Sequence, residues 1–309
     1  RRPFFFWIGN TDTARHRWRY DPAGWQGLDA AKLRVPPQFP DDPVTRSALM
    51  AYYASVRTMD RAVGEDIARL EKLGLLDDTV VVYTSDNGWQ MPRGLANCYD
   101  TGTRVPFAVR WGRRLAGGSV RDEFVSLTDL APTFVELAGL PVEPHVTGRS
   151  IAGLILGRED SVRRDAVFLE RERHANVRRG DLSYPVRGIR TKDFLYVRNF
   201  APDRWPLGSP KFTGRADLPP AETLEQATYT AFADMDASPT KAWVIGHFDD
   251  PRYRWIYDLA FGKRPAEELY DLSKDPDQVK NVAAEPAYAA TRERLAAQLL
   301  DVLKAAEDP

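Results

Sequence analysis

The order of apolar and polar positions predicts alternating strands and helices in the first part of the chain. An apolar run over residues 4–8 predicts a core strand. Over residues 45–73 apolar side chains recur at helical spacing, and Gly74 follows as a stop signal. Residues 79–88 and 105–112 then predict two further strands. The order strand, helix, strand favours an α/β sheet with parallel members.

The second part of the chain has a different pattern. Residues 126–138 predict an amphipathic helix, with Thr128 or Asp129 as its N-cap. Residues 286–306 predict a last helix whose apolar side packs on the rest of the molecule. Between these helices, shorter strand-like pieces predict a small antiparallel sheet: AVFLERER, VRGIRT, FLYVRNF and EELYDL.

This change of pattern divides the chain into two predicted domains. Residues 1–157 form the expected α/β domain, and residues 158–309 form the expected smaller domain with the antiparallel sheet and the terminal helix. Within the first domain, residues 11–43 are polar and rich in proline, which predicts a long surface loop. Long loops in compact domains are often functional.

Composition narrows the function classes. The 309 residues carry 43 basic and 44 acidic side chains, so net charge gives no reason to expect a nucleic acid as the main partner. No apolar run approaches about 18 residues, which excludes a membrane-spanning helix. The single cysteine, Cys98, excludes an internal disulfide framework, and we expect it to be a small buried apolar residue.

A carboxylate, a carboxamide and a glycine stand at the end of the strand predicted for residues 79–88. Ligands of open α/β sheets gather at the carboxyl ends of strands. The oxygens of Asp86 and Asn87 are hard ligands that suit Ca²⁺ or Mg²⁺, and Gly88 allows the backbone to turn sharply. Asp-Asn-Gly is also an ordinary turn sequence, so spacing alone leaves both interpretations open.

Several consecutive blocks of the chain resemble the sulfatase family. They are RPFFFWIG, TMDRAVGEDIARLEKLGLLDDTVVVYTSDNG, YDTGTRVPFAVRWG, FVSLTDLAPTFVELAGLP and RPAEELYDLSKDPDQVKNVA. Within the family the likeness is strongest to bacterial sulfatases similar to heparan N-sulfatase (sulfamidase), through VPPQFPDDPVTRSAL and ERHANVRRGDLSYPVRGIRT. The resemblance implies an alkaline-phosphatase-like α/β sandwich with a central, mostly parallel sheet, followed by a smaller C-terminal α+β domain with an antiparallel sheet.

The resemblance also implies a reaction. It identifies a hydrolase of sulfate esters or sulfamates, with a sulfated carbohydrate as the expected substrate. Family members bind Ca²⁺ through an Asp-Asn pair at this strand end and two aspartates near the N-terminus. The resemblance therefore implies that Asp86 and Asn87 bind Ca²⁺, with Mg²⁺ as the alternative. A formylglycine made in a Cys/Ser-x-Pro-x-Arg motif would be the nucleophile. This chain contains no such motif, and we expect it and the paired aspartates upstream of Arg1. Family members usually work in the periplasm or outside the cell.

Two positions differ from the family pattern. Where relatives carry a histidine after the first strand, this chain has Ala14, with His16 two residues later. Where relatives carry Lys or Arg beyond SDNG, it has Leu95, with Arg93 two residues earlier. Either His16 and Arg93 reach the same space from shifted positions, or the sulfuryl-binding groups are lost and the protein is weak, altered in substrate or inactive. We favour the first interpretation.

Further site residues follow from the resemblance. His174 matches a position at which sulfamidase-like relatives place a substrate-contacting histidine, and Arg178 and Arg187 would supply cations to a sulfated sugar. The full prediction assigns catalytic roles to His16, Arg93 and His174, substrate binding to Arg178 and Arg187, and metal binding to Asp86 and Asn87.

Two alternatives remain open. A phosphatase or phosphonate hydrolase of the same fold would act on a tetrahedral anion of similar shape, and the nucleophile would distinguish it from a sulfatase. A non-catalytic relative that binds sulfated glycan is the other alternative, and Ala14 and Leu95 are the reasons to consider it.

Overall fold

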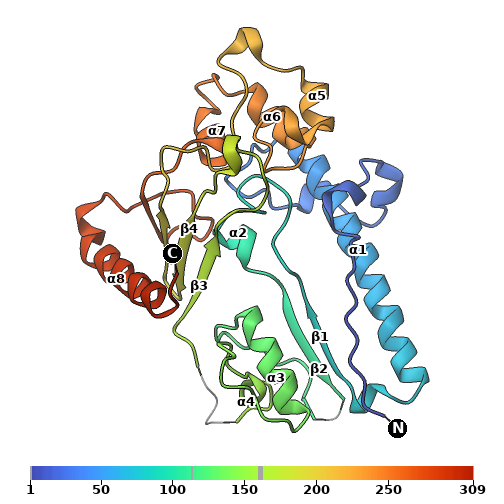
Figure 1. The fold of residues 1–309 in the computed structure, drawn as a ribbon. Coiled ribbons are helices and arrows are strands. Elements are labelled where there is room, and N and C mark those ends of the chain that lie inside the picture. Colours follow the sequence, from blue (N-terminus) through green and yellow to red (C-terminus); the bar gives the residue numbers. More distant parts are fainter. Residues whose placement is uncertain (1, 113, 159–162, 309) are drawn as a thin grey trace.

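The computed structural model describes residues 2–112, 114–158 and 163–308. The longest helix, α1 (Pro43–Lys72), lies along one side of the molecule beside the strands β1 (Val80–Thr84) and β2 (Phe107–Trp111) (Figure 1). Asp42 caps α1 by accepting a hydrogen bond from the Val44 amide. Gly74 follows with a φ of 63°, a left-handed conformation that favours glycine. The predicted helix and both predicted strands are confirmed.

The pairing of β1 with β2 is antiparallel. Val80 lies opposite Trp111 and Thr84 lies opposite Phe107. The expectation of parallel members is therefore wrong for this pair. The helix α1 precedes β1 and does not cross over between β1 and β2, so the strand–helix–strand pattern does not determine how these two strands pair. Residues 85–106 connect them and contain only the four-residue helix α2 (Asp100–Thr103).

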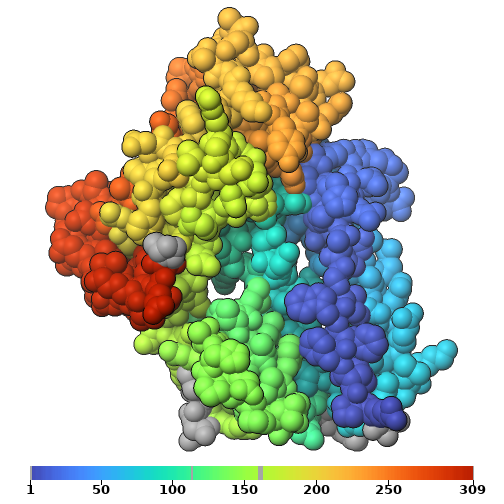
Figure 2. Space-filling model, in the orientation of Figure 1, coloured from blue at the N-terminus to red at the C-terminus, as the bar shows by residue number. Residues whose placement is uncertain are grey.

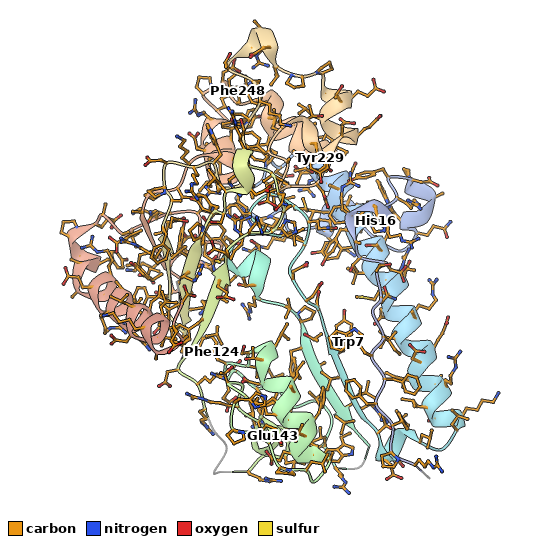
Figure 3. All side chains as sticks on the ribbon, in the orientation of Figure 1. Trp7, His16, Phe124, Glu143, Tyr229 and Phe248 are labelled. Atoms are coloured by element: carbon orange, nitrogen blue, oxygen red, sulfur yellow. The ribbon has the colours of Figure 1, made fainter. Side chains whose placement is uncertain are left out.

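The core strand predicted for residues 4–8 is not present in the described chain. Residues 2–10 have no regular secondary structure, and the side chains of Phe6 and Trp7 are 78% and 81% exposed. Figure 3 places Trp7 in the space between α1 and the two strands. The sequence pattern of a buried strand is there, but no strand of the described residues pairs with it, so its apolar side chains stay in solvent.

The loop over residues 11–43 contains short 3₁₀ turns and packs on α1. Trp18 and Phe39 from the loop are buried together with Leu49 from the helix. The expected surface loop is thus anchored by aromatic side chains at its two ends. Its turns are η1 (Arg15–Arg17), η2 (Pro22–Trp25) and η3 (Ala30–Lys32), and η4 (Leu76–Asp78) follows α1.

The helix predicted for residues 126–138 is present as the turn η5 (Leu127–Asp129) and the helix α3 (Leu130–Leu137), next to the short α4 (Ala152–Ile155). Its cap is Ser126, which forms a capping box with Asp129, and neither Thr128 nor Asp129 caps the helix alone. The Asp129 carboxylate is fully buried and is also bound by the Arg164 guanidinium. A single side chain therefore joins the start of this helix to the segment before the second sheet.

The predicted antiparallel sheet is confirmed as four strands in the order β3-β4-β5-β6. The last helix, α8 (Ala289–Ala305), covers one face of this sheet after the turn η9 (Pro286–Tyr288) (Figure 1). Leu295 and Leu299 from α8 are buried with Ile189 and Leu269 of the sheet. The strands are β3 (Ala166–Arg171), β4 (Val186–Thr191), β5 (Phe194–Asn199) and β6 (Glu267–Asp271). The domain division at 157/158 remains a prediction.

Residues 200–262, between β5 and β6, form a helical insert that the sequence pattern did not predict. Its helices are six to eight residues long, too short for a clear helical period. Phe232, Ile245 and Phe261 lie in a core of its own, and α6 contacts α1. Its elements are η7 (Arg215–Asp217), α5 (Ala221–Gln226), η8 (Thr228–Thr230), α6 (Pro239–Gly246) and α7 (Arg254–Phe261), and η6 (Arg179–Asp181) precedes the insert.

No helix of the described residues is long and apolar enough to cross a bilayer.

Candidate functional site

The carboxyl end of β1 is fixed by close backbone packing. The Gly88 amide donates to the Gly102 carbonyl at 2.8 Å, and a Cβ on Gly88 would lie 1.9 Å from the Thr101 carbonyl oxygen. Only glycine can stand this close to α2. The two preceding residues, Asp86 and Asn87, are thereby held at the point where the chain leaves the strand.

Asp86 and Asn87 offer oxygen atoms at this strand end. The Asp86 side chain is exposed, and Asn87 is half-buried. The Asn87 amide nitrogen donates to the Gly88 carbonyl at 2.9 Å, which occupies its NH₂ group rather than its oxygen. One carboxylate and one carboxamide oxygen are therefore available, and both residues line the same cavity.

These two residues supply only part of a metal site. Ca²⁺ takes six to eight oxygen ligands and Mg²⁺ takes six. Within the described ranges, no group of three or more His, Cys, Asp or Glu residues could hold a metal ion. The donor chemistry of Asp86 and Asn87 fits a hard divalent cation, but the described residues do not form a complete site by themselves.

The cavity beside Asp86 and Asn87 measures about 1910 Å³. It lies between the β1–β2 pair, residues 115–127 and strand β3, and the space-filling view shows the hollow near the middle of the molecule (Figure 2). Pockets for one small ligand measure roughly 300–1,000 Å³. This space is larger than one small ligand needs, so it can admit additional polypeptide or an extended substrate.

His174 lines the same cavity from the loop that follows β3. Its Nδ1 lies 2.7 Å from the Asp234 Oδ1, and its side chain is 41% exposed. The hydrogen bond to Asp234 raises the pKa of His174 above its usual value. The structure therefore places His174, Asp86 and Asn87 in the lining of one cavity.

Arg178 lies behind His174 rather than at the cavity wall. Its Nε donates to the Trp205 carbonyl at 3.0 Å, and its guanidinium also binds the Pro206 carbonyl. The Arg178 guanidinium is 3.8 Å from the Asp234 Oδ2, and its side chain is only 8% exposed. Arg178 thus contributes positive charge next to the carboxylate that binds His174, with little surface left for a substrate.

Arg93 and Arg187 are held away from the cavity by other partners. The Arg93 side chain is buried, donates to the Gln278 and Leu259 carbonyls, and stacks over the Tyr99 ring with 3.7 Å to its centroid. Arg187 is also buried and forms two 2.8 Å hydrogen bonds with Asp308. In this arrangement both guanidinium groups stabilise packing around the second sheet. The catalytic role predicted for Arg93 and the substrate-binding role predicted for Arg187 stay untested predictions.

His16 is exposed in turn η1, near one end of α1 (Figure 3). Its backbone carbonyl accepts a hydrogen bond from the Arg19 guanidinium at 3.5 Å. It does not belong to the residues that line the cavity with His174. The catalytic role predicted for His16 would require a different course of residues 11–43.

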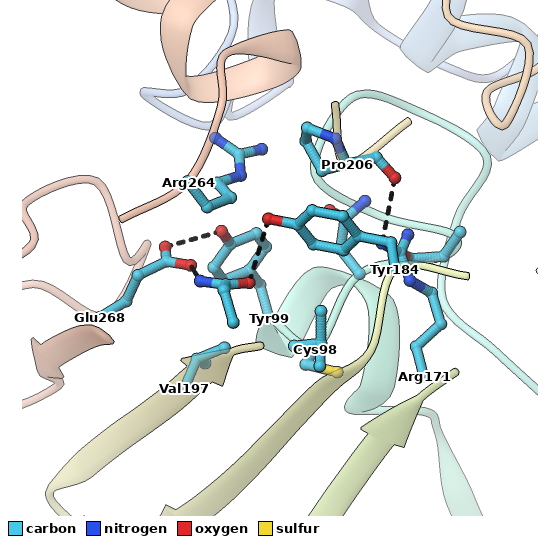
Figure 4. A pocket seen from close by; sticks show the side chains of 12 residues that line it. Cys98, Tyr99, Arg171, Tyr184, Val197, Pro206, Arg264 and Glu268 are labelled. Carbon is cyan, nitrogen blue, oxygen red and sulfur yellow. Dashed lines mark hydrogen bonds between the residues drawn. The ribbon is translucent and has the colours of Figure 1, made fainter. Parts of the chain in front are cut away.

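A second, much smaller cavity lies around Cys98 (Figure 4). Its volume of about 10 Å³ corresponds to roughly one water molecule. Glu268 accepts hydrogen bonds there from Tyr99, Tyr270 and Asn199 at 2.6–2.8 Å. Burial raises the pKa of the Cys98 thiol to about 11. Cys98 is confirmed as a buried residue of the core, and the small cavity belongs to that core.

Sequence reasoning missed Asp234 and Arg171, which surround His174. Arg171 lies 3.9 Å from Asp234 and donates to the Ala96 and Pro206 carbonyls. Asp234 stands in the helical insert, sixty positions beyond His174 in the sequence. The stretch TAFADMD that contains Asp234 has no motif that could have identified it.

Comparisons with known proteins identify the family of this chain. Residues 9–140 match the family model Sulfatase, and residues 92–209 match the model N-sulphoglucosamine sulphohydrolase, C-terminal. Human N-sulphoglucosamine sulphohydrolase is 30% identical over 292 residues, which cover 89% of this chain and 51% of the human protein. The chain thus spans about half the length of this relative.

Solved structures share the fold. BT4656, solved in complex with its substrate D-glucosamine-2-N,6-O-disulfate, superposes with a TM-score of 0.56 at 21% identity over 85% of this chain and 42% of that one. The phosphonate monoester hydrolase of Agrobacterium radiobacter gives a TM-score of 0.55 at 23% identity, over 83% of this chain and 41% of that one. At these identities the likeness concerns the fold alone.

Proposed function

Because the chain belongs to the sulfatase family, we propose that it is part of a hydrolase that removes sulfate from esters or sulfamates of a carbohydrate. The observation that carries the proposal is the common cavity of Asp86, Asn87 and His174. It combines oxygen donors for a hard cation with an imidazole that can donate a hydrogen bond to an anion. The N-sulphoglucosamine sulphohydrolase match is the reason to place a sulfated amino sugar first among the substrates.

In this proposal Asp86 and Asn87 provide two ligands of a divalent cation, Ca²⁺ first and Mg²⁺ second. Such a cation withdraws charge from the sulfuryl oxygens of a bound substrate. The remaining ligands and the formylglycine nucleophile would come from polypeptide beyond these 309 residues, because the Cys/Ser-x-Pro-x-Arg motif is not among them. His174 would bind the substrate from the opposite wall of the cavity.

The experiment that tests the proposal is sulfate release by the full-length gene product. Free sulfate is measured by ion chromatography with N-sulfoglucosamine and O-sulfated monosaccharides as substrates, before and after chelation with EGTA. We expect calcium-dependent release that falls at least 100-fold in Asp86→Ala, since a metal ligand supports charge stabilisation worth several kcal/mol. Asp122→Ala is a matched control, because Asp122 lines the same cavity in an exposed loop. Equal activity of both variants would contradict the metal role.

Two other functions have a specific observation in their favour. The phosphonate monoester hydrolase has the same fold, and phosphoryl and sulfuryl groups share a tetrahedral anionic shape, so the same variants are assayed for phosphate or phosphonate release. Ala14 and Leu95 favour a sulfated-glycan-binding protein without turnover. That protein would bind N-sulfated oligosaccharides in calorimetry and release no sulfate over days.

A further inference from the structure

On the premise of the proposed function, we propose that Asp234 of the helical insert is the positioning residue of His174. Asp234 orients the imidazole so that its Nε2 faces the cavity. The protonated ring then donates one hydrogen bond from Nδ1 to Asp234 and one from Nε2 to an anionic oxygen of the substrate. The insert then belongs to the site, although its own residues do not line the cavity near Asp86 and Asn87.

The geometry of the pair fixes the imidazole in one orientation. Asp234 is 2% exposed, and its Oδ1 lies 2.7 Å from the His174 Nδ1. An ionised carboxylate only accepts hydrogen bonds, so Nδ1 must carry the proton. Nε2 is the ring nitrogen that Asp234 does not contact, and the side chain is 41% exposed and lines the cavity. The nitrogen that Asp234 does not use is therefore the one that a ligand can reach.

The surroundings of Asp234 keep its charge available to His174. Arg171 and Arg178 lie 3.9 Å and 3.8 Å from Oδ2, but their N–H groups donate to the carbonyls of Ala96, Trp205 and Pro206. The buried Oδ2 has no hydrogen-bond partner in the described chain. Within the described chain, the hydrogen bond to His174 is the only side-chain hydrogen bond of this carboxylate, and the two arginines place positive charge beside it.

Lys241 holds the segment that carries Asp234. Its fully buried Nζ donates to the carbonyls of Thr228, Phe232 and Met235 at 2.6–3.2 Å. The Asp234 amide donates to Leu207 at 3.0 Å. These bonds fix the backbone on both sides of Asp234, so the carboxylate has little freedom to follow a displaced imidazole. A positioning residue needs such support from its own neighbours.

The charges that face His174 come from three segments. They are Arg171 at the end of β3, Arg178 in the following loop, and Asp234 and Asp236 in the insert. With His174 protonated, two arginines and one histidine stand against two carboxylates, which leaves one net positive charge next to the cavity. That sign suits an anionic sulfate group.

The test is a nitrogen-15 NMR titration of the histidines in the full-length gene product, with His174→Gln used to assign the His174 signals. In the wild-type protein we expect neutral His174 to carry its proton on Nδ1, because the acceptor at that nitrogen selects the tautomer. In Asp234→Asn we expect the pKa of His174 to fall, and the proton to move to Nε2 where the amide NH₂ group faces Nδ1. Glu222→Gln in the same insert is the matched control, since this exposed carboxylate has no contact with His174.

Two outcomes would overturn the inference: a wild-type His174 with its proton on Nε2, or the same titration curve in Asp234→Asn and Glu222→Gln. The wild-type spectrum needs no variant, so the inference stays testable even if Asp234→Asn does not fold. The measurement also separates this inference from the proposed function. If the tautomer is as expected but no sulfated substrate is hydrolysed, the function fails and the positioning stands.

Activity then shows what the positioning does. We expect Asp234→Asn to lower kcat/KM for a sulfated substrate about 10- to 100-fold and to shift the basic limb of its pH profile to lower pH. Asp234→Glu should restore part of the activity, because it restores the carboxylate. If Asp234→Asn keeps the wild-type pH profile and loses activity only because the protein unfolds, Asp234 has a structural role and does not position His174.

Discussion

A Cβ atom at residue 88 would collide with the Thr101 carbonyl oxygen at 1.9 Å and with the Gly102 backbone at 2.9 Å. The collision concerns backbone atoms, which cannot rotate away as a side chain would. We therefore expect Gly88→Ala to lower the free energy of unfolding by about 1–3 kcal/mol and to displace Asp86 and Asn87. Denaturant unfolding checks this.

The control for Gly88 is Gly117→Ala, where an added Cβ meets no atom within 4 Å. It should change stability by less than about 0.5 kcal/mol. Equal losses in the two variants would mean that the strand end tolerates a side chain, and that the fixed position of Asp86 has another cause.

Lys241 gives a prediction with a defined pH range. Burial lowers its pKa from 10.5 to about 8 in the folded chain. Between about pH 8 and pH 10.5 the unfolded chain therefore binds a proton that the folded chain does not, and stability rises with pH over this range. Lys241→Met removes this contribution. We expect the stability of the wild type relative to Lys241→Met to increase by about 1–3 kcal/mol from pH 8 to pH 10.5.

The comparison between two proteins at each pH removes the contribution of tyrosines that titrate in the same range. Lys72→Met, at the exposed end of α1, is the matched control and should show no such trend. A constant difference between wild type and Lys241→Met would mean that the three carbonyl acceptors keep Lys241 charged in the folded state.

At the scale of elements, α8 shows how one helix face stabilises the second sheet. Leu299 is 2% exposed in a core with Ile189 and Leu269, whereas its neighbour Leu300 is 49% exposed. We expect Leu299→Ala to cost about 2–5 kcal/mol of unfolding free energy and Leu300→Ala less than about 1 kcal/mol. Thermal or denaturant unfolding of the two variants measures the contrast. Similar losses would contradict the packing of α8 on the sheet.

The elements that could be predicted from the sequence are those with a long or regular pattern. The helix α1 has eight turns of repeated apolar positions, and the strands of the second sheet are apolar runs bounded by turn residues. The helical insert could not be predicted, because α5, α6 and α7 each have only about two turns. The antiparallel direction of β2 relative to β1 could not be predicted either. The apolar pattern of a strand is the same whether it pairs in a parallel or an antiparallel way.

The candidate site could be predicted only where a residue follows a strong element. Asp86 and Asn87 end a clear strand, and His174 stands in a stretch that resembles the family. Asp234 could not be found, because its partner is sixty residues away and only the packing of the insert brings them together. The role predicted for Arg93 stays untested, and in the structure its guanidinium donates to the Gln278 carbonyl.

At the scale of the whole molecule, the described chain leaves both exposed apolar surface and open space. Residues 4–8 are exposed, and the cavity of about 1910 Å³ opens beside strand β2. Folded monomers seldom leave large contiguous apolar patches in water, because such surface binds other polypeptide. The 30%-identical relative is about twice as long as the matched region, which supports the proposal that further polypeptide covers this surface in the complete enzyme.

This leads to a prediction for the 309-residue chain purified by itself. Five adjacent apolar side chains at 48–81% exposure should bind a fluorescent apolar dye and promote self-association. Phe6→Ser combined with Trp7→Ser should reduce both dye binding and the aggregated fraction in light scattering. Tyr229→Ser is the matched control, because Tyr229 is 68% exposed but stands alone in the helical insert. If the control lowers aggregation as much as the double variant, residues 4–8 are not the surface that associates, and the covering polypeptide must contact the molecule elsewhere.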